Sequence, residues 1–251
     1  MSQPGTLTLV ATPIGNLGDI TLRAIDVLKS ARVILAEDTR HSGRLLSHLG
    51  ITTPLQPYHD HNEARITPDL VQRLLGGENM ALITDAGTPG ISDPGFFLVR
   101  AALAAGVPVT MAPGPSAILP ALVLSGFPCE SFVFVGFMPR KPGELARTID
   151  ALETEQRTTV FYVSPHQFRR VLEKVAARFP DREIAVAREL TKLHEEIVRG
   201  PASEVRDKLG PRQERGEFVL VVKGLGWRKR RRDDGPDDET AEDTGADPQG
   251  A

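Results

Sequence analysis

The chain has 251 residues, of which 40% are hydrophobic and 25% are charged, an ordinary composition for a globular protein with one large or two smaller cores. The single cysteine, Cys129, excludes an intramolecular disulfide, and the short polar start at residues 1–8 gives no sign of a secretory signal. We therefore expect a cytoplasmic protein that makes no use of a membrane.

The formal net charge of −3 is unevenly distributed. Residues 228–251 contain five basic and eight acidic side chains, so the whole −3 belongs to this segment and the rest of the chain is neutral. A neutral body offers no broad field for nucleic acid, so any RNA contact is expected to use a local patch. The segment is rich in Asp, Gly and Pro, which predicts a disordered mixed-charge tail.

Apolar runs alternate with amphipathic segments, which predicts an α/β fold with largely parallel sheets. Leu22, Ile25 and Leu28 are expected on one helix face, and a second helix face is expected around Phe168–Val175. The predicted strands are Thr6–Ala11, Val33–Ala36, Ala81–Thr84, Val107–Met111, Phe132–Val135, Thr158–Val163, Ile184–Ala187 and Phe218–Val222.

Local signals mark several helix ends. Asp93 before Pro94 has the pattern of an N-cap followed by a first-turn proline, and Ser164 to Gln167 has the pattern of a capping box. Gly50 and Gly106 lie where a helix C-terminus favours a residue with positive φ.

No charged residue lies between Arg100 and Glu130, a length that would suit a transmembrane helix. Five prolines and three glycines interrupt the run, and a proline inside a helix removes a hydrogen bond and clashes with the preceding turn. A buried strand, a tight loop and a short helix are expected instead. The dense Pro and Gly step at residues 112–116 predicts a boundary between an N-terminal α/β domain at 1–116 and a C-terminal α/β domain at 117–227.

Polar clusters directly follow the predicted strands. Ligands of open α/β sheets bind at the carboxyl ends of strands, so two such sets are expected to face each other across a cleft. Each cluster also has a plain structural explanation: a βα turn, a local ion pair, a helix cap or a solvated strand edge. A purely structural explanation is least adequate for the Asp85–Gly95 loop, because this loop combines acidic residues, tight turns and the start of a helix. The clusters are Thr12–Asn16, Glu37–His41, Asp85–Pro89 with Ile91–Gly95, the connector at Pro113, Ser164–His166 and Arg188–Lys192.

Several enzyme classes find no support in the sequence. It contains no nucleophile elbow, no HExxH pair and no lysine after a Gly-rich phosphate loop. The six histidines lack the spacing of metal ligands, so no metal is expected. These absences favour a reaction that depends on binding and positioning rather than on a covalent nucleophile.

Six motifs occur together in one order, and with them the chain resembles the ribosomal RNA small subunit methyltransferase I family of the tetrapyrrole methylase superfamily. The resemblance covers roughly residues 7–224, and its first and third motifs are the most specific. The motifs are Val10–Thr21, Glu37–Arg40, Asp85–Gly95, Pro113–Ala117, Phe134–Lys141 and Ala187–Lys192.

The resemblance implies two α/β domains of the tetrapyrrole methylase type with S-adenosylmethionine in the cleft between them. It further implies a homodimer that methylates the ribose 2′-hydroxyl of a cytidine in the decoding region of small-subunit ribosomal RNA, with that RNA or the 30S subunit as partner. By motif position, the residues that would line the cofactor are Pro13, Asp85, Ala86, Gly87, Thr88, Pro89, Ser92, Pro113, Ser116, Ala117, Tyr162, Val163, Ala187, Leu190 and Thr191.

The chain departs from the family pattern in two places. Val163 and Gln167 stand where the family commonly has an acid and an arginine around the Ser-Pro-His step, which weakens a charged role for that loop. Many members end in a small helical domain, whereas here only the mixed-charge tail follows Trp227.

A ribose hydroxyl is weakly acidic, so a general base would help the transfer. The candidates by position are Asp38, Asp85, Asp93, Glu189 and Lys192, and the sequence does not choose among them. The candidates for phosphate contacts are Arg40, Arg140, Lys141 and Arg188, with Lys192 also available, and Tyr58, Phe137 and Tyr162 are the candidates for base stacking. Two alternatives stay open: a tetrapyrrole C-methyltransferase on the same fold, and a non-catalytic RNA-binding assembly factor.

Overall fold

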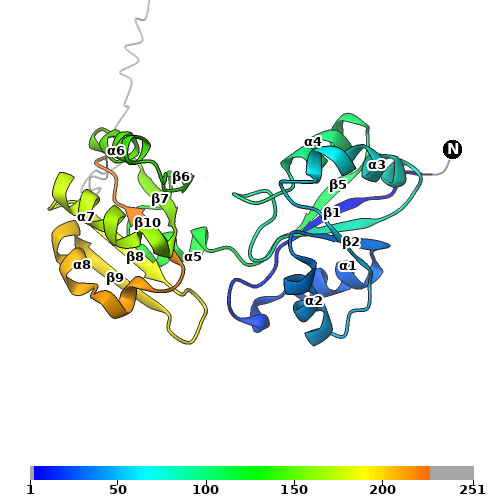
Figure 1. Cartoon of the computed structure of the whole chain (residues 1–251), viewed down its shortest axis with the longest axis horizontal. Coiled ribbons are helices and arrows are strands. Elements are labelled where there is room, and N and C mark those ends of the chain that lie inside the picture. The colour runs from blue at the N-terminus through cyan, green and yellow to red at the C-terminus, as the bar shows by residue number, and fades with distance from the viewer. Residues whose placement is uncertain (1–2, 227–251) are drawn as a thin grey trace, which may run out of the picture.

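The computed structural model describes residues 3–226 and shows two α/β lobes joined by one connector at residues 113–117 (Figure 1). The predicted tail at 228–251 lies outside the described residues. The first sheet takes its strands from the chain before the connector, and the second sheet takes its strands from the chain after it.

The first lobe contains a five-stranded parallel sheet with the order β3-β2-β4-β1-β5. Helices α1 and α2 pack on one face and α3 and α4 on the other, so the inner strands β2 and β4 are buried throughout (Figure 1). The elements are β1 (Leu7–Val10), a 3₁₀ turn (Leu17–Asp19), α1 (Leu22–Ser30), β2 (Val33–Ala36), α2 (Thr39–His48), β3 (Leu55–Pro57), α3 (Glu63–Leu75), β4 (Met80–Ile83), α4 (Phe96–Ala104) and β5 (Val109–Ala112).

The second lobe contains a mixed five-stranded sheet with the order β6-β7-β10-β8-β9. Helix α5 covers one face, and α6, α7 and α8 cover the other. The elements are α5 (Ile118–Ser125), β6 (Phe132–Phe137), α6 (Pro142–Asp150), β7 (Thr158–Val163), α7 (Phe168–Arg178), β8 (Glu183–Arg188), β9 (Glu196–Pro201), α8 (Ala202–Lys208) and β10 (Phe218–Val222), with 3₁₀ turns at Ala151–Glu153, Pro165–Gln167 and Pro211–Glu214.

The prediction of largely parallel sheets is confirmed for the first lobe and wrong for the second. There only β6 and β7 are parallel, whereas β10 runs antiparallel to both β7 and β8, and β8 runs antiparallel to β9. The short loop at residues 189–195 accounts for the antiparallel pair of β8 and β9, because a parallel neighbour needs a crossover of a dozen residues or more while an antiparallel one does not.

All eight predicted strands are present, with ends shifted by at most two residues, and β3 and β9 were missed. The buried face of α7 is confirmed, but the face expected for α1 is wrong at Leu22, which is 82% exposed while Ala24 and Leu28 are buried. In the uncharged run, β5 is an edge strand that is only partly buried, followed by the connector and α5. Among residues 3–226, no helix has the length and apolar character that crossing a bilayer requires.

Two of the four helix-end predictions are confirmed and two are wrong. Gly50 and Gly106 are confirmed, with φ of 64° and 76° just after α2 and α4. The Asp93 N-cap is wrong, because α4 begins at Phe96 after a glycine whose φ of 140° suits few other residues. The Ser164 capping box is also wrong, because its hydroxyl makes no cap bond and the Gln167 amide instead donates to the Met138 carbonyl at 2.7 Å.

Candidate functional site

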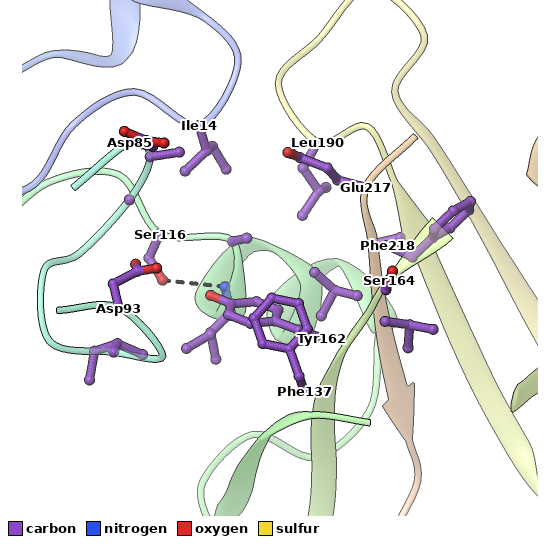
Figure 2. A pocket seen from close by; sticks show the side chains of 18 of the residues that line it. Ile14, Asp85, Asp93, Ser116, Phe137, Tyr162, Ser164, Leu190, Glu217 and Phe218 are labelled. Atoms are coloured by element: carbon purple, nitrogen blue, oxygen red, sulfur yellow. Dashed lines mark hydrogen bonds between the residues drawn. The ribbon is translucent and has the colours of Figure 1, made fainter. Parts of the chain in front are cut away.

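A cavity of about 680 Å³ lies between the lobes (Figure 2). It opens at the carboxyl ends of β1, β2 and β4 in the first sheet and is walled on the other side by the ends of β7 and β8 and the start of β10. This volume falls within the range of about 300–1,000 Å³ that small-molecule sites occupy. The cavity is therefore the candidate site, at the sheet edge where the polar motifs were expected to meet.

Main-chain hydrogen bonds tie together the loops that follow β1 and β4. Thr12 and Gly87 each donate a backbone N–H to the other's carbonyl at 2.9 Å. The Thr12 hydroxyl donates to the Thr84 carbonyl at 3.2 Å, and the Thr88 hydroxyl donates to the Pro115 carbonyl at 3.3 Å. The loop after β1, the loop after β4 and the connector, which are far apart in the sequence, are thus held together on one side of the cavity.

Three carboxyl groups, Glu37, Asp85 and Asp93, line the first-lobe side of this cavity. Burial, with the negative charges of Glu37 and Asp85 beside it, raises the pKa of Asp93 to about 7. Burial and the charge of Asp85 also raise the pKa of Glu37. A wall with this much negative charge favours a positively charged ligand.

The opposite wall is aromatic and apolar. The Tyr162 ring lies 5.0 Å from the Phe134 ring and 5.2 Å from the Phe137 ring, measured between centroids. A bulge at Gly136, whose φ is 91°, allows both phenylalanines to contact Tyr162, because residues three apart in a regular strand point to opposite faces. Burial, with the charges of Asp93 and Glu217, raises the pKa of Tyr162 to about 12, so the phenol stays protonated at neutral pH.

Backbone strain is concentrated beside the cavity. Among the described residues, the non-glycine positions with positive φ are Ser92 at 64°, Glu189 at 51° and Thr191 at 66°. The Thr191 hydroxyl is also buried without a hydrogen-bond partner within the described part of the chain. Strain and unpaired polar groups of this kind are typical of ligand-binding loops.

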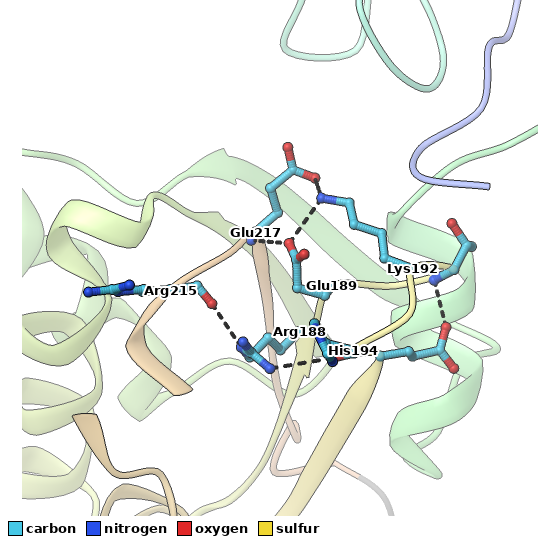
Figure 3. Close-up of polar contacts among 8 residues, drawn as sticks. Arg188, Glu189, Lys192, His194, Arg215 and Glu217 are labelled. Carbon is cyan, nitrogen blue, oxygen red and sulfur yellow. Dashed lines mark hydrogen bonds and ion pairs between the residues drawn. The ribbon is translucent and has the colours of Figure 1, made fainter. Parts of the chain in front are cut away.

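A charged cluster fixes the loop that follows β8 (Figure 3). The Lys192 ammonium donates to Glu189 at 2.9 Å and to Glu217 at 3.0 Å, and Glu189 accepts the Glu217 backbone N–H at 2.9 Å. Burial tends to raise the pKa of Glu189, but these contacts outweigh it and hold that pKa below its usual value. Burial tends to lower the pKa of Lys192, but the two carboxylates raise it overall.

Most residues expected to line the cofactor line this cavity. They are Asp85, Ala86, Gly87, Thr88, Ser116, Ala117, Tyr162, Val163, Ala187 and Leu190. The others, Pro13, Pro89, Ser92, Pro113 and Thr191, lie in the same loops but are not part of its lining.

Of the five candidate bases, Asp85 and Asp93 line the cavity, while Glu189 and Lys192 belong to the charged cluster. Asp38 caps α2, where it accepts the backbone N–H groups of Arg40 at 2.8 Å and His41 at 3.3 Å.

The candidate cations also fall in different places. Arg140 lines the cavity, the Arg40 side chain is 91% exposed, and Lys141 pairs with Glu144 at 3.3 Å on the surface. Arg188 donates to the carbonyls of Arg215 at 2.8 Å and His194 at 3.4 Å (Figure 3).

Tyr58 is a wrong prediction for base stacking, since it is fully buried in the first lobe. Sequence reasoning placed Glu37 in a polar cluster but gave it no role at the site, and it missed Glu217. Glu37 directly follows β2, and its position after a buried strand is what marked the cluster in the sequence. Glu217 comes before β10, and it reaches the cavity only because that strand runs antiparallel to its neighbours.

The described residues contain no group of three or more His, Cys, Asp or Glu side chains that could hold a metal ion. The cavity does suit S-adenosylmethionine. Ile14, Ile118, Leu190 and Val219 offer apolar contacts for an adenosine, and the acidic wall complements a sulfonium charge.

Comparison with known proteins gives consistent results. The family model of Tetrapyrrole (Corrin/Porphyrin) Methylases matches residues 6–206. The chain is 48% identical to "Ribosomal RNA small subunit methyltransferase I" of Xylella fastidiosa (strain Temecula1) over 89% of this chain and 83% of that protein. It is 46% identical to the protein of the same name from Bacillus subtilis (strain 168), over 89% of this chain and 76% of the relative.

Two solved structures share the fold. The methyltransferase CobJ is 22% identical with a TM-score of 0.63, and the match covers 90% of this chain and 96% of the other. Uroporphyrin-III-C-methyltransferase from Thermus thermophilus is 24% identical with a TM-score of 0.59, over 88% and 96% of the two chains. Membership of this methylase family implies S-adenosyl-L-methionine as the methyl donor, as expected from the sequence. The chain belongs to the tetrapyrrole (corrin/porphyrin) methylases and, among them, to the ribosomal RNA small subunit methyltransferase I family.

Proposed function

We propose that this protein methylates small-subunit ribosomal RNA, at the ribose 2′-hydroxyl of a cytidine in the decoding region. The observation that carries the proposal is its 48% identity, over 89% of the chain, to a relative named for methylation of that RNA. The interlobe cavity supports it, since its acidic wall and aromatic wall would take a cationic cofactor and a flat base.

The cofactor would lie between the loops after β4 and β5 and the ends of β7 and β8. S-adenosylmethionine, when bound, supplies a methyl group on a positively charged sulfur. Asp85, Thr88 and Ser116 would contact it from the first lobe, and Tyr162 and Leu190 from the second. Enclosing the reacting atoms between two walls excludes water and aligns them, which is the main requirement of such a transfer.

The RNA would enter at the rim of the cavity and contact a few cations. Arg140 lines the cavity itself. Lys141 is the next residue in the chain, and Arg40 comes three residues after the cavity-lining Glu37; both side chains are exposed. Because few phosphates would be contacted, we expect a modest dependence of affinity on salt.

A homodimer and a cytoplasmic location are further parts of the proposal. The dimer is supported by large apolar side chains that are exposed on α4 and α5, where Phe96 is 63% and Val123 is 65% exposed. Light scattering of the purified protein tests the dimer directly, and a monomer at working concentration would contradict it.

The test of the function uses S-adenosylmethionine with a labelled methyl group and small subunits from cells that lack the enzyme, or their free RNA. We expect label in one cytidine, at an internucleotide link that resists alkaline hydrolysis because the 2′-oxygen is blocked. Label on a base carbon or nitrogen would overturn the proposal. Transfer to a porphyrinogen-type acceptor would favour a tetrapyrrole methylase, and RNA binding without cofactor affinity would favour an assembly factor.

A further inference from the structure

The ribose hydroxyl must lose a proton during the proposed transfer, and most acids and amines near the cavity are already engaged. Asp38 accepts two backbone N–H groups at the start of α2. Glu189 and Lys192 form an ion pair at 2.9 Å, and each makes a second bond, to the backbone or side chain of Glu217. A carboxylate held by donors, or an ammonium held by two carboxylates, is a poor proton acceptor.

The two remaining candidates differ in their contacts. Asp85 lines the cavity, but one of its oxygens accepts the Asp38 backbone N–H at 3.2 Å. Asp93 also lines the cavity; the Thr84 side chain favours its ionised form, but no ion pair or backbone N–H holds its carboxylate among residues 3–226. Its side chain lies on the first-lobe wall, across the cavity from Tyr162 and Phe137 (Figure 2).

The local backbone fixes Asp93 in this position. Ser92 before it has a φ of 64°, and Gly95 after it has a φ of 140°. Pro94 between them is buried. A carboxyl group placed by a strained, buried turn loses little entropy when a substrate arrives, as a positioned acid or base requires.

We propose that Asp93 is the proton acceptor of the methyl transfer. The inference rests on the proposed function, and it selects one group from the five that the sequence left open. The ribose oxygen would form a bond to the methyl carbon as the carbon–sulfur bond breaks and its electron pair stays on sulfur. The hydroxyl proton passes to the Asp93 carboxylate, which later releases it to water.

The charges that face Asp93 suit this role. Glu37, Asp85 and Asp60 contribute negative charge from the first lobe, and the neutral Tyr162 faces it from the second. Together with burial, these carboxylates raise the pKa of Asp93 to about 7, near the pH at which a cytoplasmic enzyme works. A base with such a pKa is partly ionised at neutral pH and stronger than an ordinary carboxylate.

The decisive variant is Asp93→Asn, compared with Asp26→Asn on the exposed side of α1. We expect Asp93→Asn to lower kcat by about 10²–10⁴-fold, a larger change than the loss of S-adenosylmethionine affinity that follows from one fewer acid in the cavity wall. The wild-type kcat/KM, which reports the free enzyme, should rise about tenfold per pH unit below pH 7 and then level off, and this rise should be missing in the variant. Asp93→Glu should recover part of the rate, and Asp26→Asn should match wild type.

A second readout needs no turnover. In the ligand-free protein, the carboxyl carbon signal that disappears in Asp93→Asn should titrate near pH 7 in ¹³C NMR. A signal that titrates near pH 4, or a variant with the wild-type kcat and pH profile, would overturn the inference. If the wild type transfers no methyl group to RNA, the proposed function itself fails, whereas an active wild type with an equally active Asp93→Asn removes only the role of Asp93.

Discussion

At the scale of single residues, the carboxyl group of Asp93 makes the stability of the fold depend on pH. Its folded pKa of about 7 lies above the ~3.9 of an unfolded aspartate, so between these values the folded state binds a proton that the unfolded state lacks. This contribution to stability is complete below about pH 4 and is lost as the pH rises through about 7.

Replacing Asp93 by asparagine removes this dependence. Relative to wild type, we expect the variant to gain on the order of 1–2 kcal/mol in unfolding free energy between pH 5 and pH 8, allowing for screening by solvent. Urea denaturation at several pH values measures this, with Asp26→Asn as the control for loss of one surface charge. A difference from wild type that stays constant from pH 5 to pH 8 would contradict the burial of this carboxyl group.

Gly216 is a residue whose replacement should damage the charged cluster. Its φ is 110°, and a Cβ atom there would lie 2.7 Å from Glu189 Cγ and 2.8 Å from Glu189 Cδ. We expect Gly216→Ala to lower the unfolding free energy by about 1–3 kcal/mol, through backbone strain and displacement of Glu189. The control is Gly143→Ala in α6, where an added Cβ meets nothing within 4 Å and helix propensity should improve. Equal melting temperatures for the two variants would show that Gly216 has no special role.

At the scale of elements, α7 holds the second lobe together through one buried face. Leu172 is 1% exposed and packs in the core below the second sheet. Leu172→Ala should lower the unfolding free energy by about 2–5 kcal/mol, because it leaves a cavity in a close-packed interior. Lys174→Ala on the exposed side of the same helix should change it by less than about 0.5 kcal/mol. Chemical denaturation followed by circular dichroism separates them, and a similar effect of both would mean that helix propensity rather than packing dominates.

The sequence predicted most directly those strands whose burial is uniform. β2, β4 and β10 are buried along their whole length, and a continuous apolar run reports that directly. β3 and β9 are edge strands with polar residues or prolines, so neither shows a clear apolar pattern. Strand direction was not predictable in the second lobe, because β10 comes last in the chain yet pairs in the middle of its sheet.

The candidate site was predictable where it depends on the ends of parallel strands. Asp85 and its neighbours in the β4 loop follow from that rule, since every parallel strand presents its carboxyl end at the same edge. Glu217 did not follow, because its strand points the other way. Phe137 was expected to stack on a base, but the bulge that brings it onto Tyr162 had only the lone Gly136 as a signal.

At the scale of the whole molecule, the two lobes approach each other through loops beside the cavity. A Cβ atom on Gly15, in the loop after β1, would overlap Lys192 Cγ and lie 3.0 Å from Thr191 Oγ1, both from the second lobe. On another loop, the Ser92 hydroxyl lies 3.6 Å from the position of a Cβ on Gly136. These contacts bring loops of both lobes together. The absence of a side chain at Gly15 and Gly136 therefore determines how closely the two lobes approach each other beside the cavity.

The contact between Gly15 and Lys192 can be tested by a double-mutant cycle on cofactor affinity. Gly15→Ala should weaken S-adenosylmethionine binding about tenfold, because the new methyl group forces the Lys192 stem away and separates the lobes at this point. Lys192→Ala removes the stem, although it also leaves Glu189 and Glu217 without their cation, so its own effect is not the test.

In the Lys192→Ala background, Gly15→Ala should weaken binding by less than about threefold, and calorimetry of the four proteins gives the coupling. Gly143→Ala, far from both loops in the chain, serves as the control and should leave affinity unchanged in either background. If Gly15→Ala weakens binding equally with and without the Lys192 stem, the loop after β1 acts on the cofactor directly and not through closure of the lobes.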